Sequence, residues 1–171
     1  MTEHDDTSPA APADPRPAGG STPPPVSAEE TVAAPAAALF ALLADPARHL
    51  EIDGGTNVAA PVDPAPITGV GDTFRMDLAH GVRVECVVHR FERDRAIAWE
   101  PGRLGEPPSG QLWTWELEPL SDESTRVRLT YDGTRIAPDQ EKRLARAWAL
   151  TEEKLVGSIR RLGAAADRPA R

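Results

Sequence analysis

Apolar and polar residues alternate through the middle of the chain, between residues 73 and 132. An apolar side chain at every second position is typical of a strand with one buried and one exposed face. Such runs, each bounded by Gly, Asp, Ser or Pro, predict the strands Thr73–Leu78, Val82–Phe91, Ala96–Glu100, Gln111–Pro119 and Thr125–Asp132. Together they predict an antiparallel meander with one apolar face.

The alternation also assigns side chains to the inner face of this sheet. It is clean in three strands, where the inner residues are Phe74, Met76 and Leu78, then Trp113, Trp115 and Leu117, then Val127, Leu129 and Tyr131. The strand Val82–Phe91 is less regular, with apolar residues on both faces. Hairpin pairing with the preceding strand puts Val84 and Cys86 on the inner face and His89 and Phe91 on the outer face, unless a bulge intervenes.

A helical period replaces this alternation near the C-terminus. Apolar residues at steps of three, four and seven mark one face of a helix, and they are Leu144, Trp148, Leu155, Ile159 and Leu162. Pro138 suits the first helical position and Gly163 can end the helix. The pattern predicts one long amphipathic helix from Pro138 to about Leu162, lying against the sheet.

The N-terminal part of the domain predicts a short strand and two short helices. The strand is Glu30–Ala34, and Pro35 opens a helix whose buried face carries Leu39, Phe40, Leu42 and Leu43. Asp45 and Pro46 are an N-cap and first-turn pair for a second helix, which runs toward Ile52. Residues 56–72, rich in Pro and Gly, predict a long loop or a ragged edge strand. We interpret that segment either as a flexible lid over a binding site or as an ordinary surface loop.

Composition divides the chain into three parts. Residues 1–26, rich in Pro and Ala, predict a disordered tail; residues 27–165 predict one folded domain; residues 166–171 predict a disordered end. The net charge of -8 argues against nucleic acid as a partner. We interpret the Lys and Arg residues of the C-terminal helix as a solvated face, with an anionic partner site as the alternative.

Cys86 is the only cysteine, so the chain has no intrachain disulfide and no Cys-based zinc site. The sequence predicts no cofactor and no metal. No apolar run approaches the roughly 18 residues that span a bilayer, so we expect no stable membrane insertion and a cytoplasmic protein. A monomer and a homodimer are both compatible with the sequence.

The order of elements resembles the helix-grip fold of the START-like superfamily, also called the Bet v 1-like or SRPBCC group. The local sequences that carry the resemblance are Val32-Ala33-Ala34-Pro35, Ala44-Asp45-Pro46-Ala47-Arg48-His49, Glu51-Ile52-Asp53-Gly54, Gly71-Asp72-Thr73-Phe74-Arg75-Met76, Ile97-Ala98-Trp99 and Trp113-Thr114-Trp115-Glu116-Leu117-Glu118-Pro119. They cover about residues 31–162 and look like the polyketide cyclase/dehydrase branch. The resemblance implies an α+β fold in which a curved antiparallel sheet wraps around a long C-terminal helix.

The resemblance also implies a hydrophobic cavity between the sheet and that helix. We expect this cavity to bind a hydrophobic or aromatic small molecule, lipid-like or polyketide-like. The residues expected to line it and to contact the ligand are Phe74, Met76, Trp99, Trp113, Trp115, Leu129, Tyr131 and Trp148. For each of them, ordinary core packing is the alternative.

No sequence motif identifies a catalytic centre. The polar or reactive candidates are His49, Asp53, Glu85, Cys86, His89, Tyr131, Thr151 and Ser158. Tyr131 is the residue expected both inside the sheet and able to donate a hydrogen bond.

Three functions remain open from the sequence. The first, which we favour, is a binder or carrier of a hydrophobic small molecule. The second is a cyclase or dehydratase that uses acid and base residues of the cavity. The third is a protein-interaction module, for which the Pro-rich tail is the only support.

Overall fold

The structure is a computed structural model, and it describes residues 22–54 and 57–168. Its centre is one antiparallel sheet in the order β1-β7-β6-β5-β4-β3-β2. The strands are β1 (Val26–Val32), β2 (Val58–Val62), β3 (Thr73–Leu78), β4 (Arg83–Glu92), β5 (Ala96–Arg103), β6 (Leu112–Ser121) and β7 (Ser124–Asp132). Consecutive strands from β2 to β7 are neighbours, which confirms the predicted meander.

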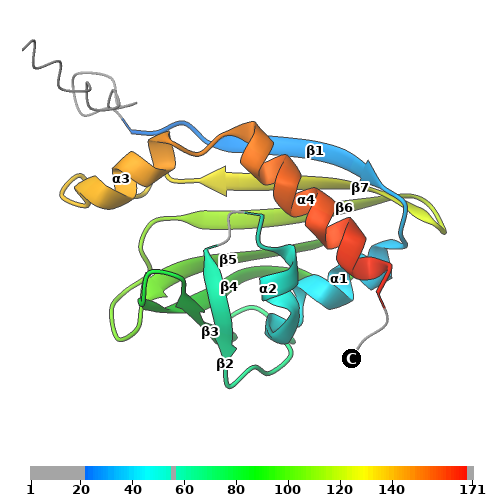
Figure 1. The fold of residues 1–171 in the computed structure, drawn as a ribbon, viewed down its shortest axis with the longest axis horizontal. Coiled ribbons are helices and arrows are strands. Elements are labelled where there is room, and N and C mark those ends of the chain that lie inside the picture. The colour runs from blue at the N-terminus through cyan, green and yellow to red at the C-terminus, as the bar shows by residue number, and fades with distance from the viewer. Residues whose placement is uncertain (1–21, 55–56, 169–171) are drawn as a thin grey trace, which may run out of the picture.

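The helices lie over one face of this sheet (Figure 1). They are α1 (Ala36–Leu43), a 3-10 turn (Pro46–Arg48), α2 (His49–Ile52), α3 (Glu141–Trp148) and α4 (Glu152–Ala166). The fold is therefore α+β, a helix-grip arrangement in which the curved sheet holds the C-terminal helix. None of the helices in the described ranges is long and apolar enough to cross a membrane.

Strand register confirms the predicted inner face. Phe74 pairs with Cys86 and Trp115 pairs with Leu129, so these four side chains share one side of the sheet. Phe91 faces inward, and not outward as was expected. The reason is a bulge at position 89, because Val88 lies opposite Trp99 but Arg90 lies opposite Ala98. The extra residue turns Phe91 inward, where its ring meets that of Phe40 at a centroid distance of 5.2 Å.

The first strand begins earlier than predicted. β1 spans Val26–Val32 instead of Glu30–Ala34, and Pro23 before it is fully buried. β1 therefore begins at the last residue of the predicted tail, and the division of the chain into tail and domain stays a prediction. The rest of the predicted tail, residues 1–21, lies outside the described residues, as do residues 169–171 of the predicted C-terminal end.

The C-terminal helix is two helices, and the prediction of one helix from Pro138 to Leu162 is wrong. α3 starts at Glu141, and α4 starts after Thr151, whose extended backbone (φ -118°, ψ 156°) cannot continue a helix. Leu155, Ile159 and Leu162 of α4 are fully buried against the sheet, as the pattern predicted.

Gly163 does not end the helix, since α4 continues to Ala166. A Cβ atom at this position would lie 2.9 Å from Val32 Cγ1. Gly163 therefore lets α4 pack closely on β1.

Two further predictions concern the segment between α1 and β3. Asp45 is an N-cap, because its carboxylate accepts a hydrogen bond from Ala47 N at 3.0 Å, as expected. Residues 58–62 form the edge strand β2. The loop after β2 is tied to the body of the protein: Ile67 is buried and its N–H donates to Ala44 O at 2.8 Å.

Candidate functional site

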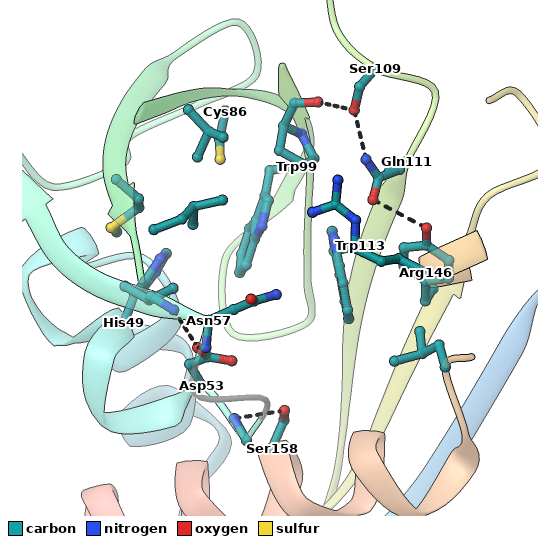
Figure 2. A pocket seen from close by; sticks show the side chains of 18 of the residues that line it. His49, Asp53, Asn57, Cys86, Trp99, Ser109, Gln111, Trp113, Arg146 and Ser158 are labelled. Carbon is teal, nitrogen blue, oxygen red and sulfur yellow. Dashed lines mark hydrogen bonds between the residues drawn. The ribbon is translucent and has the colours of Figure 1, made fainter. Parts of the chain in front are cut away.

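A cavity of about 590 Å³ lies between the inner face of the sheet and helices α2, α3 and α4 (Figure 2). Its volume falls within the range of roughly 300–1,000 Å³ that is usual for small-molecule sites. Seven of the eight residues predicted to line it do so: Phe74, Met76, Trp99, Trp113, Trp115, Leu129 and Tyr131. Their contact with a ligand remains a prediction.

Trp148 is the exception, and its predicted place in the cavity is wrong. It is half-buried at the end of α3 and lies outside both the cavity lining and the hydrophobic core. The break after α3 shifts the register between the two halves of the predicted apolar stripe. As a result Ala149 and Leu150, which follow α3, line the cavity instead.

An aromatic cluster closes one end of the cavity. The His49 ring stacks on Trp99 at a centroid distance of 5.1 Å and meets Phe74 edge-on, also at 5.1 Å. His49 Nε2 donates a hydrogen bond to Leu43 O at 2.8 Å. Burial lowers the pKa of His49 to about 4, although the bond to Leu43 opposes the shift. At neutral pH the imidazole is therefore uncharged and joins α2 to the sheet.

A chain of hydrogen bonds starts at Tyr131 on the opposite wall. Its hydroxyl donates to Gln111 Oε1 at 3.2 Å, Gln111 Nε2 donates to Ser109 Oγ at 3.0 Å, and Ser109 Oγ donates to Pro101 O (Figure 2). Burial raises the pKa of Tyr131 to about 12, against the effect of the nearby Arg143 and Arg146. Tyr131 is thus a neutral hydroxyl whose oxygen can still accept a hydrogen bond.

The other candidates for chemistry have structural partners or face away. Asp53 accepts from Asn57 N and Val58 N at 2.5 and 2.6 Å, and so braces the entry to β2. Ser158 Oγ accepts from Gly54 N at 3.1 Å (Figure 2). Burial raises the pKa of Cys86 to about 12, which keeps it a thiol.

The remaining three lie outside the cavity lining. Glu85 pairs with Arg75 on the outer face, His89 Nε2 lies 3.1 Å from Glu100 Oε2, and Thr151 is the N-cap residue of α4. Within residues 22–54 and 57–168 there is no group of three His, Cys, Asp or Glu side chains that could hold a metal ion.

Positive charge lines the mouth of the cavity. Arg146 and Lys154 are exposed, as expected of a solvated face, and they also belong to the cavity lining. Arg143 and Arg146 of α3, Lys154 of α4 and Arg103 of β5 all belong to its lining. Of the described residues 57–72, Asn57 and Val58 belong to the cavity lining and the others do not. A lid formed by this segment stays a prediction.

One of the two features that sequence reasoning missed does have a local sequence signal. Thr151 followed by Glu152 and Glu153 is a sequence signature of a helix N-terminus. It indicates that a new helix begins there, and the break between the two helices displaces Trp148 from the cavity. Gln111 and Ser109 had no comparable signal, because they act through contacts with Tyr131 and Pro101, about 20 and 8 residues away in sequence.

Sequence comparison agrees with the fold. The family described as "Polyketide cyclase / dehydrase and lipid transport" matches residues 24–166, and the chain belongs to this family. It is 38% identical over 109 residues to "Uncharacterized protein Rv0088" of Mycobacterium tuberculosis. That match covers 63% of this chain and 46% of the relative, so the chain spans about half the length of the relative.

Two solved structures show the same fold. Protein MLL2253 from Mesorhizobium loti superposes with a TM-score of 0.62 at 19% identity, covering 86% of this chain and 99% of that one. The Zhui aromatase/cyclase from Streptomyces sp. R1128 superposes with a TM-score of 0.61 at 18% identity, covering 86% of this chain and 95% of that one. At these identities the likeness concerns the fold.

Proposed function

We propose that this protein binds a hydrophobic or aromatic small molecule, lipid-like or polyketide-like, in the cavity between the sheet and the C-terminal helices. The observation that carries this proposal is the cavity of about 590 Å³, with three tryptophans, a phenylalanine and a tyrosine in its lining. Large aromatic side chains with a few polar groups are the usual lining of small-molecule sites. Membership of a family described by cyclisation, dehydration and lipid transport supports the same class of ligand.

The state of the titratable groups favours binding over catalysis. A general acid or base works best with a pKa near the working pH. His49 has a pKa of about 4, and Cys86 and Tyr131 have pKa values of about 12. Asp53 is engaged by two backbone amides. These groups are therefore suited to packing and to orienting a ligand, and not to proton transfer near neutral pH.

A second candidate function is a cyclase or dehydratase activity on a polyketide-like chain. The chain of hydrogen bonds from Tyr131 through Gln111 to Ser109 favours it, because it holds the Tyr131 hydroxyl in one orientation, with its oxygen able to accept a hydrogen bond from a substrate hydroxyl. The structural likeness to an aromatase/cyclase adds support at the level of the fold. The interaction-module alternative rests on a tail that is mostly outside the described residues.

Native mass spectrometry of the purified protein tests the binding proposal, and we expect a co-purifying apolar molecule. Tyr131→Phe then separates the two functions. A carrier should lose about 0.5–1.5 kcal/mol of binding free energy, the net value of one hydrogen bond. An enzyme should lose roughly 100-fold in turnover with little change in affinity.

Thr130→Val is the matched control, because Thr130 Oγ1 bonds Ser27 Oγ on the other face of the same strand. Thr130→Val should change neither the binding free energy nor the turnover. Failure to detect any apolar ligand, by mass spectrometry or by quenching of tryptophan fluorescence, would contradict the binding proposal.

A further inference from the structure

The charge of the cavity lining is opposite to that of the whole chain. The chain has 27 Asp and Glu against 19 Lys and Arg. The lining has four cations, Arg103, Arg143, Arg146 and Lys154, and one carboxylate, Asp53. Four cations against one carboxylate leave the lining with an excess of positive charge.

The cations of the lining also differ from other arginines in their partners. Elsewhere, Arg83 binds Asp77, Arg128 binds Glu29 and Arg160 binds Glu30, each through two hydrogen bonds. Among the described residues no carboxylate lies within 4 Å of Arg143 or Arg146.

Three of these cations make their polar contacts with neutral atoms. Arg143 donates to Gln140 Oε1, Arg146 Nε donates to Lys142 O at 3.2 Å, and Lys154 Nζ donates to Ala149 O at 3.3 Å. Arg103 has only Glu106 at 3.9 Å. Each guanidinium carries five N–H donors, so most of the donors of Arg143 and Arg146 remain available to a ligand.

The two arginines of α3 are held in an unfavourable arrangement. Partial burial and the like charge of Arg146 lower the pKa of Arg143. Both arginines also act on the Tyr131 hydroxyl, so the positive potential reaches the aromatic wall. An anion at this place would relieve the repulsion and satisfy the free donors.

The cationic and the apolar side chains lie in different parts of the cavity. Figure 2 shows Arg146 reaching from α3 toward Trp113, so that its guanidinium lies beside the aromatic wall. The apolar residues Phe74 and Met76 lie on β3, four strands away from β7 in the sheet order. The cavity therefore has an apolar part at β3 and β4 and a cationic part at α3.

We propose that the ligand is amphipathic, with an apolar or aromatic body against the sheet and a terminal carboxylate bound by Arg143 and Arg146. This inference rests on the proposed function and adds the chemical class of the ligand. Arg103 and Lys154 add positive potential at the mouth. A neutral ligand of the same shape would leave the partly buried Arg143 and the exposed Arg146 without a carboxylate of the described residues within 4 Å.

A matched pair of probes tests this inference on the full chain. Pyrenebutyrate and pyrenebutanol share the apolar body and differ in the terminal group, and both quench tryptophan fluorescence by energy transfer. We expect the wild type to bind pyrenebutyrate about 10-fold or more tightly than pyrenebutanol, as one charge-assisted contact provides. Raising the salt from about 0.1 M to about 1 M should reduce this preference, since the screening length falls from roughly 10 Å to 3 Å.

Two variants sharpen the test. Arg143→Gln with Arg146→Gln should remove most of the preference for pyrenebutyrate while leaving the affinity for pyrenebutanol within about 2-fold, because only the charged contact is lost. Arg161→Gln is the control: it makes the same chemical change on α4 at an exposed position outside the cavity lining, and should change neither affinity. Circular dichroism should show that all three proteins are folded.

The outcomes separate this inference from the proposed function. Equal affinity for the two probes, or an equal loss of both in the double variant, would overturn the carboxylate assignment and leave the hydrophobic site standing. Failure of both probes to bind would overturn the proposed function and this inference with it.

Discussion

The two walls of the cavity are built on different principles. The sheet wall, from β3 to β7, presents side chains that alternate with polar residues along each strand, and Leu129, Trp115 and Met76 are nearly inaccessible to solvent. The helical wall is formed by helix ends and connections, including Asp53, Ala149 and Leu150. On the sheet, a side chain's place follows from its position in the strand, whereas on the helical wall it follows from where each helix stops.

The walls also differ in polarity. The described part of the sheet wall contributes mainly aromatic and aliphatic groups, and the helical wall contributes Arg143, Arg146 and Lys154. Such charges are tolerated because the α3 side of the cavity opens to solvent, with Arg146 exposed. We therefore expect the sheet wall to supply stability and volume. Under the proposed function, the helical wall supplies selectivity for the ligand.

The largest expected effect tests the stability part of this comparison. Trp115→Ala removes a buried side chain from the sheet wall and should lower the free energy of unfolding by about 3–5 kcal/mol. Trp148→Ala makes the same change at the end of α3, outside the core, and should cost about 1 kcal/mol or less. Urea unfolding of both variants measures the difference, and equal costs would refute it.

The next effect concerns His49, where the two walls meet. The folded pKa of about 4 lies below the ordinary value of 6.5, so above pH 6.5 the imidazole is neutral in both states and costs nothing. As the pH falls from 6.5 toward 4, the unfolded chain binds a proton that the folded protein cannot accept, and stability is lost. The loss should reach about 3 kcal/mol below pH 4.

His49→Gln should lack this part of the pH dependence, although its stability at neutral pH is lower. The measurement is the free energy of unfolding of both proteins between pH 7 and pH 4, roughly the range over which a buried histidine titrates. Parallel curves for the two proteins would show that the His49 imidazole is not held neutral.

The smallest expected effect compares two glycines of α4. A Cβ at Gly157 meets no atom within 4 Å, so Gly157→Ala should stabilise the helix by about 0.5–1 kcal/mol. A Cβ at Gly163 would lie 2.9 Å from Val32 Cγ1, so Gly163→Ala gains the same helix propensity but forces β1 and α4 apart. Thermal unfolding should separate the two variants by about 1–3 kcal/mol. Equal stabilisation would mean that α4 is not closely packed on β1.

Local sequence determined the sheet and its inner face. Phe74, Trp113 and Tyr131 lie inside, as predicted, because strand geometry turns every second side chain to the same side. Asp45 and Pro46 likewise set the start of a helical turn through contacts within a few residues. These features depend on neighbours in sequence, so the sequence by itself was sufficient for them.

Tertiary structure decided the features that depend on distant contacts. The bulge at position 89 turned Phe91 inward, where Phe40 of α1 packs against it. Because the helix breaks before Thr151, the axis of α3 does not continue that of α4. Trp148 therefore lies outside the cavity, whereas Arg143 and Arg146 line it. The amphipathic pattern specifies which face of a helix is apolar, but the surface that a helix covers depends on how its ends are joined and packed, and periodicity holds no information about that.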